Sequence, residues 1–335
     1  MTVHRQRQPQ LTLTAPGVAV WADVPVPRLS GAGDALVRPV AVATCDLDTA
    51  VNAGRFRLPL PYALGHEFVA EVLQTAPDVS TVRPGDVVAV PFQISCGVCA
   101  RCRRGLTGDC AGVPPLSMYG LGTLGGEWGG AVTETVRVPH AEAMLVPLPP
   151  GLPPAAVASL DNLPDAWRAV GPYLPGLEDK RVLVLGAASI GLYTVAIARA
   201  LGAHVTYLGP GQETAARLGA DIGERDQRLG PFPITVPTSG RAEDLLLALR
   251  ATEPAGICID TGIHTEDVTL PLFRMYTTGV TLVTGRAAAR RDIPMILDLV
   301  ATGRLDPTII TATTATWDQA PQAWSDHHAK LVLTR

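Results

Sequence analysis

The sequence predicts an α/β protein in which a mostly β domain is followed by a doubly wound parallel sheet. Two observations support this prediction. Short β-type runs separated by glycine and proline dominate residues 1 to about 150. From about residue 180, strand-like and helix-like segments alternate in the rhythm of βαβ units. Between the two regions lies the proline-rich stretch VPLPPGLPPA at 146–155.

The expected strands of the first region are short apolar or alternating segments bounded by turn residues. They are ALVRPVAVAT at 35–44, EFVAEVLQ at 67–74, DVVAVPF at 86–92 and AVTETVRVP at 131–139.

The second region begins with RVLVL at 181–185, which is typical of a buried strand. Apolar residues then recur at the spacing of a helix that packs on a sheet, at Ile190, Tyr193, Thr194, Ile197 and Leu201. Further strands are expected at HVTYL (204–208), FPITV (232–236), GICID (256–260) and VTLVTG (280–285). The tail from about 290 adds a helix (IPMILDLVATG), a strand-like TIIT and a final KLVLTR.

Composition narrows the class of protein. The chain has 335 residues, of which 47% are hydrophobic and 17% charged, as expected of a globular protein with two cores. A net charge of -4 argues against general attraction to nucleic acid or to an anionic membrane. No apolar run approaches the roughly 18 residues of a membrane span. We therefore expect a cytoplasmic protein without nucleic-acid or membrane partners.

Four cysteines lie close together in CGVCARCRRGLTGDC, with the spacing C-x2-C-x2-C-x7-C. In a reducing compartment, dense cysteines are more often metal ligands than disulfides. The spacing predicts a closed zinc-thiolate site, which is structural because no coordination position stays open. Unmetallated thiols and a DNA-reading finger are the alternatives. The ligands would be Cys96, Cys99, Cys102 and Cys110.

The turn GAASIG follows the first strand of the second region and precedes the expected helix. A glycine turn in this place is where a dinucleotide pyrophosphate docks on a helix N-terminus. Two residues depart from the usual pattern: Ala188 replaces the middle glycine, and Gly209 stands where an acidic residue would bind the ribose. A plain tight turn is the alternative. The expected contacts are Gly186, Ala188, Ser189, Ile190, Gly191 and Gly209.

Several motifs together resemble the zinc-containing medium-chain dehydrogenase/reductase family of the alcohol dehydrogenase type. They follow the family's order over nearly the whole chain. The resemblance implies a GroES-like, zinc-binding catalytic domain at 1–160 and 290–335, and a Rossmann dinucleotide-binding domain at 161–289. The motifs are TCDLD, LGHEF, RPGDVVAV, the four-cysteine loop, GGAVTETVRVP, GAASIG and LDPTIIT.

The resemblance implies a catalytic zinc held by Cys45, His66 and Asp161. One thiolate, one imidazole and one carboxylate leave a fourth position open, as catalytic zinc requires. Asp165 lies one helical turn beyond Asp161 and competes for the role of third ligand.

Five further residues take roles by the same resemblance. Asp48 would orient the zinc-binding histidine. Glu67 would lie behind the zinc and approach it when ligands exchange. An ordinary buried ion pair is the alternative for both Asp48 and Glu67. Lys330 would reach the coenzyme pyrophosphate, with an exposed surface lysine as the alternative. Phe92 would form a wall of the substrate pocket, with plain core packing as the alternative, and Leu47 would also line that pocket.

Two departures from the family bear on the chemistry. Leu47 stands where the family has a serine or threonine whose hydroxyl relays the substrate proton, and leucine cannot carry a proton. Gly209 removes the carboxylate that repels a 2′-phosphate, but the first basic residue after that strand is Arg217. The sequence therefore favours NADP(H) only slightly over NAD(H).

The sequence as a whole predicts an oxidoreductase with two zinc ions per chain. It would transfer a hydride between NAD(P)(H) and a small alcohol or carbonyl substrate polarised by zinc. Reduction of an activated C=C or C=N bond, non-redox catalysis by zinc, and a non-enzymatic scaffold that has lost its coenzyme are the alternatives. The resemblance also implies a homodimer or homotetramer.

Overall fold

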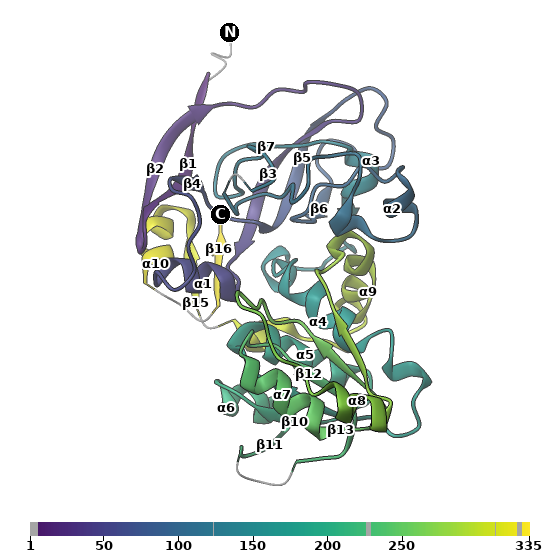
Figure 1. Ribbon diagram of the computed structural model, residues 1–335. Helices are drawn as coiled ribbons and strands as arrows, with labels where there is room; N and C mark the ends of the chain where they lie inside the picture. The colour runs from purple at the N-terminus through teal and green to yellow at the C-terminus, as the bar shows by residue number, and fades with distance from the viewer. Residues whose placement is uncertain (1–5, 123, 226–228, 312, 327–329) are drawn as a thin grey trace. The chain divides into compact units, whose positions relative to one another are not determined.

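The computed structural model describes residues 6–122, 124–225, 229–311, 313–326 and 330–335 (Figure 1). Within these residues, no helix is long and apolar enough to cross a membrane.

The chain forms two compact units. The first comprises Met1–Asp161, Ala288–Ala301 and Thr311–Arg335, and the second comprises Asn162–Ala287 and Thr302–Ile310.

The short segment 302–310 lies with the second unit, whereas the sequence placed it in the catalytic domain. Two contacts explain the difference. The 3-10 helix η4 (Pro307–Ile310) packs on helix α5 (Ala188–Ala200), and the Arg304 guanidinium donates a hydrogen bond to the Ala200 carbonyl at 3.0 Å.

The first unit is built on two sheets. One has the strand order β2 (Val18–Pro25), β1 (Arg7–Ala15), β4 (Tyr62–Ala63). The other has the order β15 (Thr313–Thr316), β16 (Leu331–Thr334), β3 (Ala35–Ala43), β5 (Glu67–Thr75), β6 (Val87–Val90), β8 (Val146–Pro147), and β7 (Val136–Val138) also pairs with β3. The expected mostly β character of this region is confirmed.

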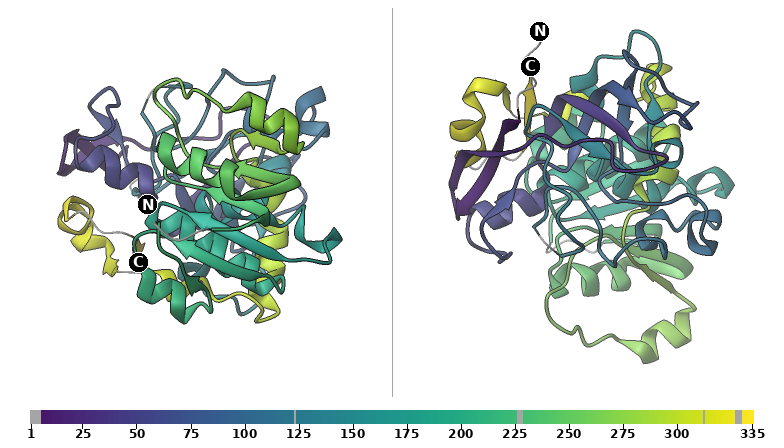
Figure 2. Two further views of the ribbon diagram at one scale, coloured as in Figure 1. Left: turned by 60° about the horizontal axis from the view of Figure 1, so that its bottom comes forward. Right: turned by 90° about the horizontal axis from the view of Figure 1, so that it is seen from above.

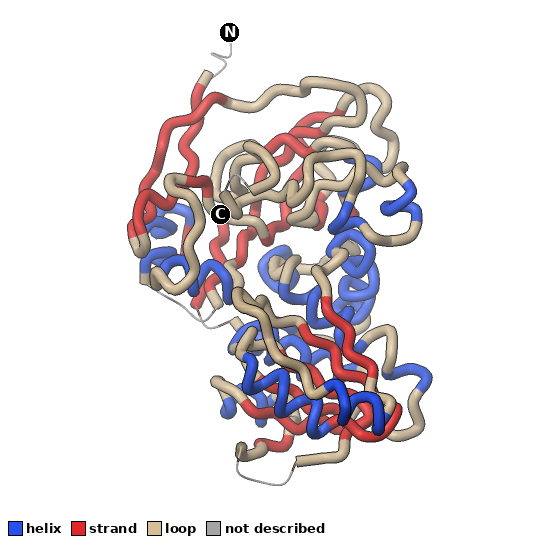
Figure 3. Tube along the Cα trace, viewed as in Figure 1, coloured by secondary structure: helices blue, strands red, loops and turns tan. Residues whose placement is uncertain are grey.

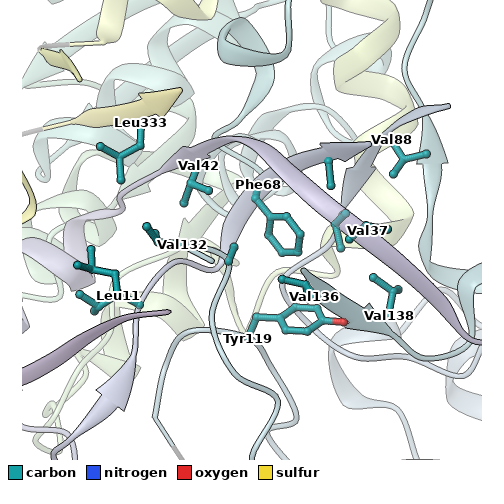
Figure 4. Close-up of a cluster of buried hydrophobic side chains, with 14 of the residues drawn as sticks. Leu11, Val37, Val42, Phe68, Val88, Tyr119, Val132, Val136, Val138 and Leu333 are labelled. Carbon is teal, nitrogen blue, oxygen red and sulfur yellow. The ribbon is translucent and has the colours of Figure 1, made fainter. Parts of the chain in front are cut away.

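The core of the first unit lies where the apolar faces of these strands meet (Figure 4). Val42 of β3 is paired with Phe68 of β5, and both are fully buried. The Phe68 ring meets the edge of Tyr119 at a centroid distance of 5.5 Å. Because successive side chains of a strand point to opposite faces, burying Phe68 directs its neighbour Glu67 away from this cluster.

One longer helix, α9, and several short helices complete the first unit. They are α1 (Asp46–Asn52), α2 (Ala100–Arg103), η1 (Thr107–Asp109), α3 (Ala141–Met144), η2 (Pro154–Val157), α9 (Ala289–Ala301), η5 (Trp317–Gln319) and α10 (Ala320–Ser325).

The second unit holds a sheet with helices packed around it (Figures 2 and 3). Every strand pairing in this sheet is parallel. Its strand order is β11 (Asp221–Ile222), β10 (His204–Leu208), β9 (Arg181–Leu185), β12 (Phe232–Pro237), β13 (Thr252–Asp260), β14 (Thr281–Thr284). In chain order this is 3-2-1-4-5-6, the order of a Rossmann sheet. The predicted doubly wound fold is confirmed.

The helices of the second unit connect these strands. Helix α5 packs on β9 and β10, and α7 (Ala242–Ala251) packs on β12 and β13. Because right-handed crossovers lead away from β9 in opposite directions, these two helices cover opposite faces of the sheet. The remaining helices are α4 (Asn162–Val170), η3 (Leu174–Gly176), α6 (Gln212–Arg217) and α8 (Leu272–Thr278).

Two predicted strands differ from the structure. The strand-like TIIT is wrong, because its first residues belong to η4, where Asp306 Oδ1 accepts a hydrogen bond from the Thr308 amide at 3.0 Å and starts a turn. AVTETVRVP is a strand only at β7; earlier in the segment, Thr133 Oγ1 donates to the Pro9 carbonyl at 2.7 Å.

Candidate metal centre and dinucleotide turn

Three potential metal ligands from distant parts of the sequence meet in the first unit. Cys45 precedes α1, His66 precedes β5, and Asp161 is the last residue before α4. One donor atom from each residue lies within 4.8 Å of the others. Cys45 and His66 are buried, and the Asp161 side chain is 20% exposed. The structure therefore brings together the three residues that the sequence singled out as ligands of a catalytic zinc.

The backbone of His66 is fixed by close packing of the LGHEF segment. Gly65 has a φ of +92°, and a Cβ on it would lie 2.9 Å from Val132 Cγ2. A Cβ on Gly120 would lie 2.2 Å from the Gly65 carbonyl oxygen. Larger residues at these two positions would therefore displace His66 from the cluster.

Cys45 is held by the first turn of α1. Its backbone N–H donates a hydrogen bond to Asp48 Oδ2 at 2.9 Å. The same carboxylate oxygen lies 3.7 Å from His66 Nδ1. Asp48 is buried, so one carboxylate stands behind both Cys45 and His66, as expected of a group that orients metal ligands.

Both ring nitrogens of His66 are buried and have no hydrogen-bond partner among the described residues. His66 Nε2 lies 3.5 Å from Asp161 Oδ2, beyond the usual range of a hydrogen bond. A buried polar group without a partner is costly. A metal ion bound at Nε2, between Cys45 and Asp161, would satisfy it.

Several acidic groups lie in and around this cluster. Burial raises the pKa of the Cys45 thiol well above its usual value, and the nearby carboxylates of Asp48, Asp161 and Glu67 raise it further. Burial lowers the pKa of His66, but Asp48 and Asp161 outweigh burial and raise it to about 9.

A divalent cation would relieve this repulsion and favour the thiolate and the neutral imidazole. Sulfur, nitrogen and oxygen ligands of this kind are those that zinc takes in catalytic sites. Cys45, His66 and Asp161 therefore fit a zinc ion.

Glu67 and Lys330 form a buried ion pair beside this cluster. Lys330 Nζ lies 2.6 Å from Glu67 Oε2 and also donates to the Thr44 carbonyl. Glu67 Oε1 accepts a hydrogen bond from the Asp161 backbone N–H at 2.9 Å. Burial raises the pKa of Glu67, and Lys330 opposes that rise. Glu67 thus links Lys330 to the backbone of Asp161.

This pairing bears on two predictions. Lys330 is 1% exposed, so the alternative of an exposed surface lysine is wrong. Its contact with a coenzyme pyrophosphate stays a prediction. The link from Lys330 through Glu67 to Asp161 could not be read from the sequence, because Lys330 precedes a strand that only the sheet topology places beside β3.

Asp165, the competing candidate for third ligand, takes a different partner. It lies in α4, where its carboxylate is ion-paired with Arg168, one helical turn further on. The group of potential ligands within the described residues contains Asp161 and not Asp165. The geometry therefore favours Asp161.

Leu47 and Phe92, the two residues expected to line the substrate pocket, lie near the cluster in different senses. Leu47 follows Cys45 by two residues in the sequence, and Phe92 contacts His66 in space. The Phe92 ring is buried and meets the His66 ring at 5.8 Å in an edge arrangement. Leu47, in α1, is partly buried and packs against the core. Neither residue offers a group that can transfer a proton.

The four cysteines of the loop converge around α2. One sulfur from each of Cys96, Cys99, Cys102 and Cys110 lies within 4.8 Å of the others. The sulfurs of Cys99 and Cys110 are 4.0 Å apart, and none of the four forms a disulfide. Tetrahedral zinc with Zn–S bonds of about 2.3 Å needs sulfurs about 3.8 Å apart.

Backbone amides favour thiolates in this loop. Cys99 Sγ accepts hydrogen bonds from the N–H groups of Cys102 and Ala111, both at 3.4 Å, and these bonds lower its pKa to about 6. Cys110 Sγ accepts from Cys96 and Gly112, both at 3.3 Å. Burial and the neighbouring sulfurs of Cys99 and Cys110 instead raise the pKa of Cys102 to about 12, and a cation bound among the sulfurs would offset that rise. The four sulfurs therefore also fit a zinc ion.

The GAASIG turn joins β9 to α5 in the second unit. Gly186 has a φ of +131°, and a Cβ on it would lie 2.6 Å from the Ser239 backbone nitrogen, so glycine is required. Ala188 is the first residue of α5, and Ser189, Ile190 and Gly191 follow in its first turn. This is the strand–turn–helix geometry of a dinucleotide pyrophosphate site.

Thr238 was not among the predicted residues, but it holds this turn. Its hydroxyl accepts a hydrogen bond from the Ala187 N–H at 2.8 Å and donates to the Leu185 carbonyl at 3.1 Å. Thr238 directly follows β12, the strand beside β9. Its place at the carboxyl end of the neighbouring strand was the sequence signal available.

Comparisons with known proteins extend these observations. The alcohol dehydrogenase GroES-like domain family matches residues 31–150. The probable zinc-binding alcohol dehydrogenase of Mycobacterium tuberculosis is 28% identical over 327 residues, which are 91% of this chain and 82% of that protein.

The glutathione-independent formaldehyde dehydrogenase of Pseudomonas aeruginosa is 32% identical over 215 residues, but the match spans only 52% of that protein. Among solved structures, the alcohol dehydrogenase TADH of Thermus sp. ATN1 has a TM-score of 0.89 and 29% identity, over 97% of this chain and 99% of that one. The likeness therefore covers both units.

Proposed function

Because the chain belongs to the zinc-containing medium-chain dehydrogenase/reductase family, we propose that it transfers a hydride between a nicotinamide coenzyme and an alcohol or carbonyl substrate. The observation that carries the proposal is the cluster of Cys45, His66 and Asp161. Three ligands leave a fourth position for a substrate oxygen, and only Asp161 of the three is partly exposed.

Each residue of the cluster has a task in this reaction. Zinc held by Cys45, His66 and Asp161 would supply the positive charge that polarises the substrate oxygen. Asp48 holds the Cys45 backbone and faces His66 Nδ1, so it keeps Nε2 turned toward the metal position. Glu67 fixes the Asp161 backbone.

The surroundings of His66 exclude water. The Phe92 ring covers one edge of the imidazole, and His66 has no exposed surface. A dry site strengthens the attraction between the metal and a developing oxyanion. The hydride itself would pass between the substrate carbon and the nicotinamide ring.

The cysteine loop would hold a second, structural zinc. Its four sulfurs form a closed set, so it offers no position to a substrate. We therefore expect two zinc ions per chain with different roles.

A second candidate function is favoured by Leu47. Alcohol oxidation needs a path for the hydroxyl proton, and Leu47 has no group that supplies one. Reduction of an activated C=C or C=N bond, or a non-redox reaction promoted by zinc, does not require this position to carry away the proton of a substrate hydroxyl. Leucine is compatible with either reaction. The open set of three ligands argues against a scaffold without catalysis.

We also propose that the protein is a homodimer that pairs through its second unit. Strand β14 ends the sheet, with no strand paired on its far side within the described residues. The preceding helix α8 has no buried residue and exposes Leu272, Phe273 and Tyr276 to 66%, 81% and 85%. An open edge beside exposed apolar side chains is a surface that a second copy would cover by two-fold pairing.

Metal analysis tests the two zinc sites separately. We expect about two zinc ions per chain in the native protein and about one in either Asp161→Asn or Cys99→Ser, because each substitution removes a charged ligand. Asp165→Asn is the matched control and keeps both. Loss of a zinc in Asp165→Asn but not in Asp161→Asn would reverse the assignment.

Coenzyme titration tests the oxidoreductase proposal. Fluorescence or calorimetry should show NADH or NADPH binding with a Kd below about 1 mM, the upper end of the range usual for enzyme KM values. A panel of small alcohols and carbonyls should then change the nicotinamide absorbance. If neither coenzyme binds below the millimolar range, the proposed function is wrong.

Substitution of Leu47 tests the missing proton relay. Leu47→Thr should raise kcat for alcohol oxidation by about tenfold or more, since positioned proton transfer contributes about 10²–10⁴-fold. Leu47→Val has the shape of threonine without the hydroxyl, and it should give no gain. Equal rates in both variants would mean that another group already moves the proton.

Light scattering after gel filtration tests the dimer. Phe273→Glu together with Tyr276→Glu should yield monomers, because the substitutions place charges on the apolar surface. Val98→Glu, on a side chain that is 72% exposed in the first unit, should remain dimeric. A native protein that is monomeric at micromolar concentration would contradict the proposal.

A further inference from the structure

The acidic residue missing after β10 leaves no empty space in the second unit. A Cβ on Gly209 would lie 2.5 Å from the Gly186 carbonyl oxygen and 2.6 Å from the Tyr207 hydroxyl oxygen. Real Cβ atoms do not approach other atoms this closely, so no side chain fits at position 209 in this arrangement. Tyr207 and the turn together exclude it.

Tyr207 is fixed in this place. It is fully buried, and its hydroxyl donates a hydrogen bond to the Pro210 carbonyl at 2.7 Å. The same oxygen lies 3.4 Å from the Ala187 carbonyl, within the glycine turn. A Cβ on Gly191 would lie 3.2 Å from Tyr207 Cε2, so the ring also packs on the first turn of α5.

The strand geometry explains why one residue replaces the other. Alternate residues of a strand point to the same face, so Tyr207 and position 209 face the same way. The phenol of Tyr207 extends along that face and ends where a side chain of residue 209 would begin. Tyr207 is therefore one of the two groups that leave no room for a side chain at 209, the other being the Gly186 carbonyl.

Because Tyr207 and Gly209 stand in place of an acidic residue, the charge beside the glycine turn is changed. A carboxylate in this position accepts hydrogen bonds from the ribose hydroxyls of NAD and repels the 2′-phosphate of NADP. The Tyr207 hydroxyl is neutral and its proton is directed to Pro210. It neither repels a phosphate nor supplies a positive charge to bind one.

We propose that Tyr207 is a specificity-determining residue that makes the coenzyme site nearly indifferent to the 2′-phosphate. This inference rests on the proposed function, since it concerns the coenzyme of the same reaction. Arg217 is exposed and lies at the far end of α6. The Arg225 guanidinium is already paired with Asp244, which also accepts a hydrogen bond from Ser239 beside the glycine turn. Neither of these described basic side chains is a free partner for a 2′-phosphate at the turn. The dissociation constants of NADH and NADPH should therefore agree within about tenfold, with at most a slight preference for NADPH.

The test removes the Tyr207 phenol and restores the acid, so that only the Gly186 carbonyl of the turn still has to shift. In the double variant Tyr207→Val, Gly209→Asp, the dissociation constant of NADPH should rise at least about tenfold relative to that of NADH, because the new carboxylate repels the 2′-phosphate. Tyr207→Phe keeps the ring and the charge and should leave the ratio unchanged. Tyr193→Phe, at another buried tyrosine of the same unit, is the matched control. The readout is direct coenzyme binding.

Thermal unfolding tests the steric part without coenzyme. Gly209→Asp alone should lower Tm, because its Cβ meets the Tyr207 hydroxyl and the Gly186 carbonyl. Tyr207→Val also lowers Tm by emptying buried space, so the comparison is between backgrounds: Gly209→Asp should lower Tm less in Tyr207→Val than in the native protein. A loss just as large in the Tyr207→Val background would overturn the claim that the tyrosine helps to exclude the acid.

The results of these experiments distinguish failure of the proposed function from failure of the role proposed for Tyr207. If the native protein binds neither coenzyme, the proposed function fails, and the Tm comparison still decides the steric claim about Tyr207. If both coenzymes bind but the double variant keeps the native ratio, only the role of Tyr207 fails. A native preference for NADH above about tenfold would also contradict it.

Discussion

The buried acidic charge around His66 is the constraint on which the first unit depends. Asp48, Glu67 and Asp161 surround the thiol of Cys45 and the imidazole, and burial makes each unpaired charge costly. Lys330 forms an ion pair with one of these carboxylates, that of Glu67. The ligand atoms of Cys45, His66 and Asp161 lie close together, and neither ring nitrogen of His66 forms a hydrogen bond among the described residues. A divalent cation bound between them would stabilise this arrangement.

The fold serves this cluster through sheet register and close backbone approach. Pairing of β16 with β3 places Leu331 beside Thr44, so that Lys330 enters the interior next to Glu67. The glycine at position 65 lets the loop before β5 pass close to Val132, which sets the position of His66. The second unit uses the same device at Gly186, where Thr238 and the glycine turn meet. In both units, glycine marks the points where the backbone must approach closely.

The fold class, the candidate metal ligands and the glycine turn were predictable from the sequence, for a physical reason. Metal ligands and glycine turns must combine particular residue types at short spacing, so GHE, the cysteine loop and GAASIG carry their meaning locally. Contacts set by sheet register carry no local signal. The burial of Lys330 and the exclusion of a side chain at 209 by Tyr207 and the Gly186 carbonyl both depend on such contacts. TIIT has the composition of a strand, but a capping aspartate before it turns the chain instead.

The central claim is that an open zinc site is formed by Cys45, His66 and Asp161. An anomalous difference map from crystals of the native protein, recorded at the zinc absorption edge, tests it most directly. We predict a peak about 2.3 Å from Cys45 Sγ and about 2.0–2.1 Å from His66 Nε2, with Asp161 as third ligand and a water or substrate oxygen as fourth. A peak at the cysteine loop alone, with His66 hydrogen-bonded to protein or water instead, would contradict the account.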